Sequence, residues 1–579
     1  MDLHIFDKDL KEQTNKNKIF IGWDSEEINT FLENNKKELR LKYLNIIHSI
    51  ISKNSSKFKY LKLKEINLLK MSLINEKNPF KSEAIFDCLK LLTIELIVKK
   101  KKIKNIFYHG KKYNLDKSLK NFCSQININY YKKKLIFFNS NFKFVFFLKG
   151  SLFFIIQFIK NFKLKSNLKK FSTISIFSYF VHLKSVTGSK FNSNLWGNLT
   201  KYLNSKKKNI NWFHFYVPSN QIKKAQIANL MQKKFNLNKY ENHNFINSFL
   251  TNLNFIKSYY FFLIFCSRNF FSTKVNYNFF QNKFSKTNFY FFLKEDFFSS
   301  LFGVTLIYNI MNILTFDKLL KEIPRQKYGI YIIENQSWEY CFIKLWKKYN
   351  HGKIIAYFNS SIRFWDLRYL KKKNEFYALD ENPDLYLINS KIFKLEAKKI
   401  GYPLKKLFLV EALRYNKLTP ALKIKKNRKI LIVGDILFNQ TDNLLKFINK
   451  ITVKLNSYKF YLKPHPTMTY KSINIFKTKY PYLKITSINS DKFKNFEFVI
   501  CSNGTSANLD CLAQRLNFCS IKPYNSLNLY PIEKYQKIFQ VKDHKDLINR
   551  IKKPQYFKDI KIFEKAKNLN KIQKILNKI

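Results

Sequence analysis

Two short polar segments of the sequence have the composition of an anion-binding site. They are Lys-Pro-His-Pro at 463–466 and Ser-Asn-Gly-Thr-Ser at 502–506. Lysine and histidine supply positive charge, and the prolines on both sides of His465 fix the backbone and disfavour helix. Gly504 permits close backbone approach or a positive φ, and a helix that starts after the second segment directs its N–H groups and positive dipole end at an anion. We expect His465 to be catalytic. The residues expected to bind a phosphate are Lys463, Ser502, Gly504, Thr505 and Ser506.

The pattern around these segments places both of them at strand ends. Strand-like runs at 459–462 and 496–501 precede the two segments, a helical pattern at 507–513 follows the second, and a third apolar run lies at 518–521. Strand, polar turn, helix and strand in this order are typical of a parallel sheet, whose loops after the strands face the ligand crevice. Each segment alone is commonly just a turn or a helix N-cap. Their combination at strand ends favours a site.

Lys-Pro-His-Pro followed by a Ser-x-x-Thr-Ser turn resembles the C-terminal, nucleotide-binding half of GT-B glycosyltransferases that build bacterial capsule and lipopolysaccharide. Bacterial sialyltransferases, capsule Kdo transferases and glycerophosphotransferases of teichoic-acid synthesis carry similar His-Pro and Ser/Thr motifs. The resemblance implies that the histidine and the hydroxyl turn hold the phosphates of a nucleotide donor.

A second strand–helix–strand unit with polar strand ends lies upstream. A strand at 329–333 ends at Glu334, a helical pattern covers 338–349, and a strand at 353–358 ends in Asn-Ser-Ser. The residues expected on the acceptor side of a cleft are Asn335, Asn359, Ser360, Arg363 and Asp366.

The upstream unit also resembles a narrower group, the surface-carbohydrate biosynthesis proteins of bacteria. The segments at 334–339 and 363–369 carry this likeness, together with Ser-x-x-Trp-Gly at 193–197 and Asn-Trp-x-His at 211–214. Related capsule enzymes often have a histidine where this chain has Asn359. The likeness covers the chain from about residue 72 to residue 530.

Glu334 is our candidate for a general base. An acceptor hydroxyl is a weak nucleophile near neutral pH and needs a base within hydrogen-bond reach, and a carboxylate beside the donor phosphates would repel them. Glu334 ends an apolar strand at the edge where parallel sheets present ligand groups. The alternative role for Glu334 is that of a structural charge at the N-terminus of the following helix. Two competing carboxylates fit structural roles better. Asp366 lies between two arginines and favours an ion pair, and Glu339 falls in the first turn of a helix, where the dipole stabilises an acid.

Composition excludes some functions and leaves others open. The 579 residues exceed one ordinary core, and the formal charge of +67 is extreme. Lysines are spread along the whole chain, and Lys, Asn, Ile, Phe and Tyr are overused together, as an AT-rich genome would produce, so we expect no nucleic-acid partner. The charge suits an anionic membrane surface or substrate.

Seven scattered cysteines without metal-ligand spacing indicate a reduced compartment, and we expect neither metal nor cofactor.

The sequence predicts three regions. Residues 1–60 form an N-terminal extension, 61–422 an acceptor-side α/β domain, and 423–579 a donor-binding domain with tail helices. An insert near 142–165 is rich in aromatic and aliphatic residues but carries lysines, so it fits either an interfacial helix or hairpin on a membrane or a buried core helix. The N-terminus lacks the features of a signal peptide, and we expect a cytoplasmic protein, peripheral on the inner membrane.

The predicted fold is α/β and GT-B-like, with two Rossmann-like domains facing a cleft. The predicted function is a metal-independent glycosyltransferase of surface polysaccharide synthesis, which moves a sugar from a nucleotide donor to a glycan or glycolipid. A CMP-linked acidic sugar is one donor considered. The alternatives are a CDP-glycerol-type polyol-phosphate transferase and a non-catalytic assembly protein on the same fold.

Overall fold

The structure is a computed structural model of the 579-residue chain. It describes all residues except those at 9–16, 133–141, 162–163, 169–170, 172, 182, 184–187, 189, 219–221, 273–275, 416–417, 422–425, 523–524, 554–559, 561, 565–567 and 579. The predicted domain boundary at 422/423 therefore lies outside the described residues.

The chain divides into two compact units, each built from separate stretches of sequence. The first comprises Met1–Ile159, Leu250–Asp317 and Asn335–Phe342. The second comprises Lys160–Phe249, Lys318–Glu334 and Ile343–Ile579. The regions predicted at 1–60 and 61–422 do not correspond to this division, because segments distant in sequence fold together.

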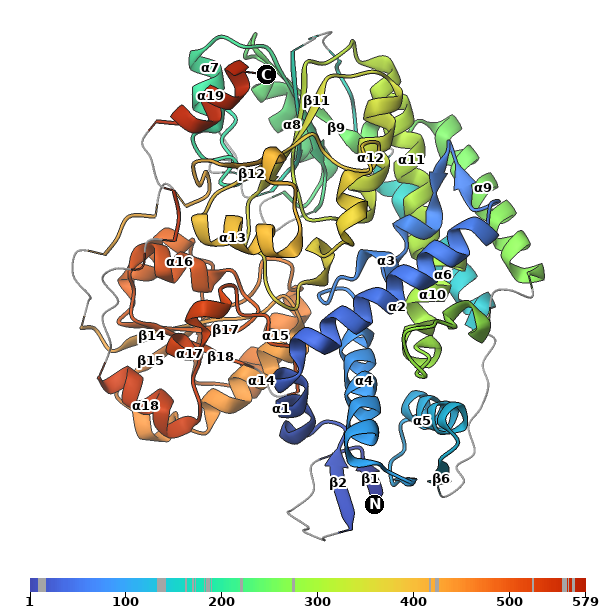
Figure 1. The fold of residues 1–579 in the computed structure, drawn as a ribbon. Coiled ribbons are helices and arrows are strands. Elements are labelled where there is room, and N and C mark those ends of the chain that lie inside the picture. Colours follow the sequence, from blue (N-terminus) through green and yellow to red (C-terminus); the bar gives the residue numbers. More distant parts are fainter. Residues whose placement is uncertain are drawn as a thin grey trace. The chain divides into compact units, whose positions relative to one another are not determined.

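The first unit has a four-stranded parallel sheet in the order β2-β1-β5-β6 (Figure 1). Its strands are β1 (Asp2–Phe6), β2 (Lys18–Gly22), β5 (Asn105–Tyr108) and β6 (Asn129–Lys132), beside a small hairpin of β3 (Lys62–Leu63) and β4 (Ile66–Asn67). Its helices are α1 (Glu26–Asn34), α2 (Lys36–Lys57), α3 (Leu73–Glu76), α4 (Ala84–Lys101), α5 (Tyr113–Ile126), α6 (Phe142–Asn161), α9 (Asn252–Phe271), α10 (Tyr290–Phe302) and α11 (Val304–Glu322). The last residues of α6 and α11 belong to the second unit. Residues 1–60, expected as an extension, thus contribute two strands to this sheet.

The second unit contains a seven-stranded parallel sheet in the order β9-β8-β7-β10-β11-β12-β13. The strands are β7 (Ile174–Tyr179), β8 (Ile210–Phe215), β9 (Glu241–Phe245), β10 (Tyr328–Ile332), β11 (Lys353–Phe358), β12 (Leu385–Ile388) and β13 (Leu407–Leu409). The helices around it are α7 (Leu199–Ser205), α8 (Ala225–Phe235), α12 (Ser337–Lys348), whose first residues belong to the first unit, and α13 (Lys391–Ile400). Chain order reverses between β7 and β10, which is the Rossmann arrangement.

A second, five-stranded parallel sheet follows in the order β16-β15-β14-β17-β18. Its strands are β14 (Lys429–Val433), β15 (Lys459–Lys463), β16 (Leu483–Ile485), β17 (Phe498–Ser502) and β18 (Phe518–Ile521). Its helices are α14 (Phe438–Asn449), α15 (Tyr470–Lys479), α16 (Ala507–Gln514), α17 (Gln536–Phe539) and α18 (His544–Lys552), and α19 (Asn570–Lys578) lies near the end of the chain. Here chain order reverses between β14 and β17.

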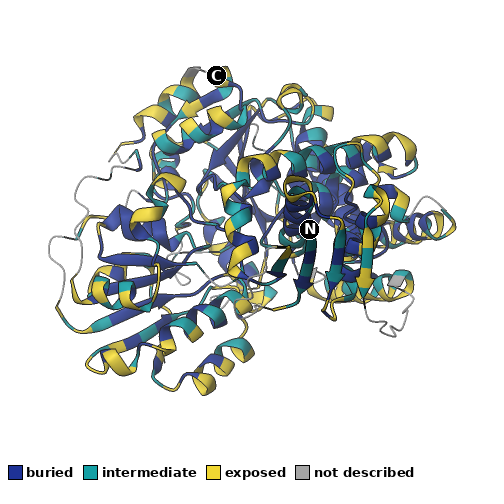
Figure 2. Cartoon of the chain, turned by 60° about the horizontal axis from the view of Figure 1, so that its bottom comes forward, coloured by how far each residue is buried: buried dark blue, intermediate teal, exposed yellow. Residues whose placement is uncertain are grey.

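The central strands of both sheets in the second unit are buried, as expected for parallel sheets covered on two faces. Most of them are apolar runs, but β9 is buried although four of its five residues are polar. Figure 2 shows the central strands in the buried colour and exposed residues on the outer faces of helices. Trp212 and Tyr357 are at most 1% exposed in one core, and Ile432 and Ile500 are fully buried in the other. The prediction of an α/β fold with two Rossmann-like sheets is confirmed.

In the part of the chain that the structure describes, no single helix is both long and apolar enough to cross a membrane. One bent pair, α10 with α11, meets those criteria when its two helices are taken together.

Candidate functional site

The predicted phosphate-binding segments both follow strands of the five-stranded sheet, as the sequence indicates. The segment at 463–466 follows β15, and the turn at 502–506 leads from β17 into α16. The turn lies at the reversal between β14 and β17, where open parallel sheets bind ligands. We call the residues 502–506 the hydroxyl turn.

A carboxylate that was not predicted from the sequence lies against the hydroxyl turn. Asp435 follows β14, and its Oδ2 accepts a hydrogen bond of 2.8 Å from the Ser502 hydroxyl. A Cβ on Gly504 would lie 2.6 Å from the same oxygen. Glycine is thus needed for close approach to Asp435, and its φ is outside the left-handed region. The position of Asp435 at the end of an apolar strand was the signal that could have found it.

Burial shifts the acidity of this carboxyl. Asp435 is only 4% exposed, and burial raises its pKa, while the hydrogen bond from Ser502 and the charge of Arg363 oppose the shift. A buried carboxylate beneath a predicted phosphate site would repel the ligand, so its protonation state matters for binding.

Two arginines from the loops of the seven-stranded sheet contact the hydroxyl turn. Arg363, 6% exposed, donates a hydrogen bond to the Gly504 carbonyl and another of 3.2 Å to Ser361. Arg414 donates to the Ser506 hydroxyl at 3.4 Å and pairs with Asp510 at 3.3 Å. Arg363 was expected on the acceptor side, and the structure connects it to the predicted donor segment. Arg414 was not selected from the sequence.

Lys463 adds a third cation near this group. It is half-buried at the end of β15. Burial lowers the pKa of its ammonium, Asp510 opposes that shift and Arg414 adds to it.

The hydroxyls at the start of α16 have few partners within the turn. Ser506 is the N-cap but makes no side-chain capping bond, and the Thr505 hydroxyl accepts a hydrogen bond of 3.3 Å from the Ala507 N–H. The Asn508 amide bonds the carbonyls of Ser502 and Thr505, both at 2.9 Å. Asn508 therefore holds the backbone of the turn, and the Ser506 hydroxyl, which caps no N–H of the helix, accepts the hydrogen bond from Arg414.

His465 is half-buried in the loop after β15. Its Nδ1 is 2.7 Å from the Thr467 hydroxyl and 3.3 Å from the Thr467 backbone nitrogen, which donates to it. Because Nδ1 accepts from the backbone, the proton of the neutral ring lies on Nε2.

At the seven-stranded sheet, Glu334 follows β10, beside the reversal between β7 and β10. It is half-buried. Burial lowers the pKa of Arg368, but the charge and hydrogen bonds of Asp366 outweigh this effect and raise the pKa well above the usual range, with a smaller contribution from the charge of Glu334. Arg368 binds both oxygens of Asp366, at 2.8 and 2.7 Å, so the expected ion pair of Asp366 is confirmed.

Two other candidates lie after β11 in the same sheet. Asn359 is 5% exposed, and its Oδ1 accepts no hydrogen bond from the described residues. Ser360 is half-buried beside it. A buried amide oxygen without a donor is uncommon and fits a group that pairs with a ligand.

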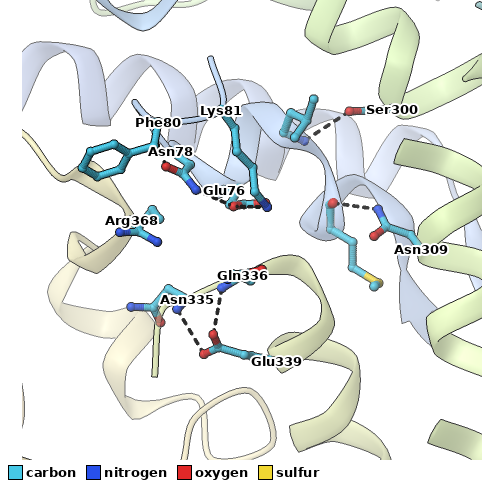
Figure 3. A network of polar contacts seen from close by, with 12 residues as sticks. Glu76, Asn78, Phe80, Lys81, Ser300, Asn309, Asn335, Gln336, Glu339 and Arg368 are labelled. Atoms are coloured by element: carbon cyan, nitrogen blue, oxygen red, sulfur yellow. Dashed lines mark hydrogen bonds and ion pairs between the residues drawn. The ribbon is translucent and has the colours of Figure 1, made fainter. Parts of the chain in front are cut away.

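Asn335 and Glu339 belong to the first unit. Glu339 accepts the backbone N–H groups of Asn335 at 3.0 Å and Gln336 at 3.1 Å, as Figure 3 shows. The carboxylate thus caps the start of α12, and the prediction that Glu339 serves the helix is confirmed. Asn335 has a left-handed backbone with φ of 53°, which asparagine tolerates better than most residues.

Among the described residues, no group of three or more His, Cys, Asp or Glu side chains is placed to hold a metal ion.

The chain matches no protein-family model and no curated protein sequence. Similar solved structures include TarM, with 11% identity and a TM-score of 0.38 over 66% of this chain and 91% of that chain. The lipopolysaccharide outer core galactosyltransferase WaaB has 14% identity and a TM-score of 0.32 over 66% and 90% of the two chains. UDP-GlcNAc 2-epimerase from Neisseria meningitidis, bound to UDP-GlcNAc, has 9% identity and a TM-score of 0.29 over 60% and 81%. These similarities are too distant to indicate an activity.

Proposed function

We propose that this chain is a glycosyltransferase that moves a sugar from a nucleotide-activated donor to a glycan or glycolipid of a bacterial surface polysaccharide. The observation that carries the proposal is the hydroxyl turn at the strand-order reversal of a Rossmann-like sheet, with Arg363 and Arg414 bonded to it. Positive side chains, hydroxyls and a helix N-terminus around one turn suit a phosphate.

In this proposal the hydroxyl turn and Lys463 hold the donor phosphates. Negative charge develops on the leaving phosphate during transfer, and preorganised cations and N–H groups stabilise it. Lys463 and the two arginines supply the charge that a metal ion supplies elsewhere, so the reaction is metal-independent and insensitive to a chelator. His465 donates a hydrogen bond from its Nε2–H to a phosphate oxygen, and the neutral ring keeps its proton.

Glu334 is proposed as the general base for the acceptor hydroxyl. It follows a strand of the other Rossmann-like sheet, so its carboxylate belongs to a different set of loops from the hydroxyl turn. Asp366 is already neutralised by Arg368, which favours Glu334 over Asp366. Asn359 and Ser360, which follow β11 of the same sheet, are proposed to contact the acceptor.

The donor class is tested by the change in melting temperature with UDP, CMP, CDP-glycerol and their sugar conjugates. A ligand at about 100 times its Kd stabilises the folded state by about 2.7 kcal/mol. Preference for CMP supports an acidic sugar donor, and preference for CDP-glycerol supports the polyol-phosphate transferase. Absence of any shift contradicts both enzymes and leaves the assembly protein.

We further propose that the protein acts in the cytoplasm at the inner membrane, where glycolipid acceptors are found, without a nucleic-acid partner. A salt titration of polynucleotide binding tests the last point, because counterion release makes such binding steeply salt-dependent.

A further inference from the structure

Two helices of the first unit are apolar around most of their circumference. They are α6 and α9, each of 20 residues. Neither contains an aspartate or a glutamate. A helix that is apolar on all sides belongs either in a core or against lipid, and the exposure of its two faces decides between these.

One face of each helix packs inside the unit. The rings of Phe147 and Phe262 stack at 5.6 Å, and those of Phe154 and Tyr259 at 4.8 Å. A Cβ on Gly150 would lie 2.7 Å from the Phe262 ring and 3.1 Å from Gly303, which separates α10 from α11. The two helices therefore lie side by side over the junction of α10 and α11.

The other face of each helix is open to solvent. Ile159 is 62% exposed and Leu152 is 59% exposed on α6, and Ile256 is 67% exposed on α9. The exposed apolar residues form stripes at helical spacing. They are Phe144, Val145, Leu148, Leu152, Ile155, Ile156, Phe158 and Ile159 on α6, and Leu253, Ile256, Tyr260, Leu263 and Phe271 on α9. This set is called the α6–α9 face. Its exposure contradicts the interpretation of α6 as a buried core helix.

The charge on these helices is of one sign. Lys149 on α6 is exposed, as are Lys257 and Arg268 on α9, and Lys143 is half-buried. Soluble monomers rarely expose a contiguous apolar patch of more than a few hundred Å², and basic residues bordering apolar side chains suit an anionic lipid interface.

We propose that the α6–α9 face is a docking surface for an anionic lipid bilayer, with both helices lying in the plane of the interface. The apolar stripes enter the boundary between headgroups and acyl chains, and the basic side chains meet lipid phosphates. A second copy of the chain is the less suitable occupant, because a two-fold interface would bring two faces of the same positive charge together. This inference does not depend on the proposed transferase activity.

The structure selects the positions for a test. Leu152 and Ile155 are 59% and 53% exposed. The double variant Leu152→Glu, Ile155→Glu therefore replaces apolar side chains of the α6–α9 face with charged ones and leaves the packing of the core unchanged. Phe154 would be a poor choice because it packs on α9. The matched control is Leu230→Glu, Leu237→Glu on and just after α8, where the exposed fractions are 60% and 78%.

The measurement is flotation of the full chain with vesicles of phosphatidylcholine alone or mixed with phosphatidylglycerol. We expect wild type and control to float with the anionic vesicles and the α6 variant to lose about 100-fold in affinity, since each buried large aliphatic side chain contributes about tenfold or more. The double variant Lys149→Gln, Lys257→Gln should lose about fivefold in affinity for each charge removed, and only with anionic vesicles. Equal flotation of the α6 variant and the control overturns the proposal. The proposal is also overturned if the wild type forms a dimer, does not bind vesicles, and loses the dimer in the α6 variant. That result would assign the face to a second copy of the chain.

A second measurement guards against misfolding of the glutamate variant. All seven cysteines are buried, so an environment-sensitive dye on Ile155→Cys reports this position selectively. We expect a blue shift of its emission with anionic vesicles and none for the dye on Leu237→Cys. Unchanged emission at Ile155→Cys, with the protein folded, would refute docking through this face.

Discussion

The two Rossmann-like sheets of the second unit share a strand order but carry different groups where that order reverses. The five-stranded sheet presents glycine and hydroxyls, with Asp435 beneath them. The seven-stranded sheet presents the carboxylate of Glu334. The same topology can therefore carry the anion site that we propose in one sheet and the base that we propose in the other, because the loops and not the strands determine the chemistry.

The contrast is reinforced by the arginines of the seven-stranded sheet. Arg368 neutralises Asp366 in its own loop, whereas Arg363 and Arg414 contact the hydroxyl turn of the other sheet. Arg414 also pairs with Asp510, and Arg363 and Arg414 place positive charge on the side on which we propose the donor phosphates.

The largest expected effect is that of His465→Ala. Removing the N–H donor proposed to stabilise the charge on the leaving phosphate should lower the transfer rate by roughly 10²–10³-fold. The melting curve should stay close to wild type because the ring is half-buried in a loop. Thr467→Val is the control, since it removes the 2.7 Å contact to Nδ1 but keeps the imidazole. Full activity of His465→Ala in a transferase assay would remove the histidine from the reaction.

Glu334→Gln tests the other side of the comparison. The substitution keeps the shape and removes the basicity, so the rate should fall by roughly 10²-fold or more while the donor Kd, measured by titration, stays unchanged. Glu339→Gln is the matched control, because that carboxylate caps α12 and its loss should affect the melting temperature more than the rate. If donor binding fails instead of the rate, the base lies elsewhere.

The positions of the strand ends could be predicted from the sequence, but the contacts between distant residues at those ends could not. The segments after β15 and β17 could be predicted because buried parallel strands are unbroken apolar runs, and polar residues mark where each ends. The contact of Ser502 with Asp435 spans 67 residues and that of Arg414 with Asp510 spans 96, and no local pattern encodes such pairings. The first unit was missed for the same reason, because its segments are separated by whole stretches of the second.

A smaller effect is expected from Thr505→Val with Ser506→Ala in the hydroxyl turn. Each lost hydrogen bond to a charged group costs about 1.5–3 kcal/mol, so the donor Kd should rise by about tenfold or more. Thr469→Val is the control: Thr469 caps α15 through a 3.2 Å bond from the Ser472 N–H, and its removal should weaken only the helix. An unmoved donor Kd in the double variant would mean that the hydroxyl turn is a helix cap and nothing more.

The smallest expected effect concerns Asp435, the acid that lies on the phosphate side of the comparison. Burial raises the pKa of its carboxyl, and a phosphate bound above the turn would raise it further by repulsion. Between the pKa of the free protein and that of the complex, binding takes up a proton, so donor affinity should increase as the pH falls through this window.

Asp435→Asn removes the charge but retains polar atoms for Ser502 and the backbone of Leu437. The variant should bind the donor a few-fold more tightly near neutral pH. A tenfold change would correspond to a difference of about one unit between the pKa of Asp435 in the free protein and in the complex. The pH dependence of donor affinity, measured by titration calorimetry, should become flatter. Asp442→Asn is the control. Hydrogen bonds from Lys479 and Lys446 lower the pKa of Asp442, although burial acts in the opposite direction, and it is proposed to have no part in donor binding. Weaker binding by Asp435→Asn, with the pH dependence intact, would show that the carboxylate organises the hydroxyl turn and does not oppose the ligand.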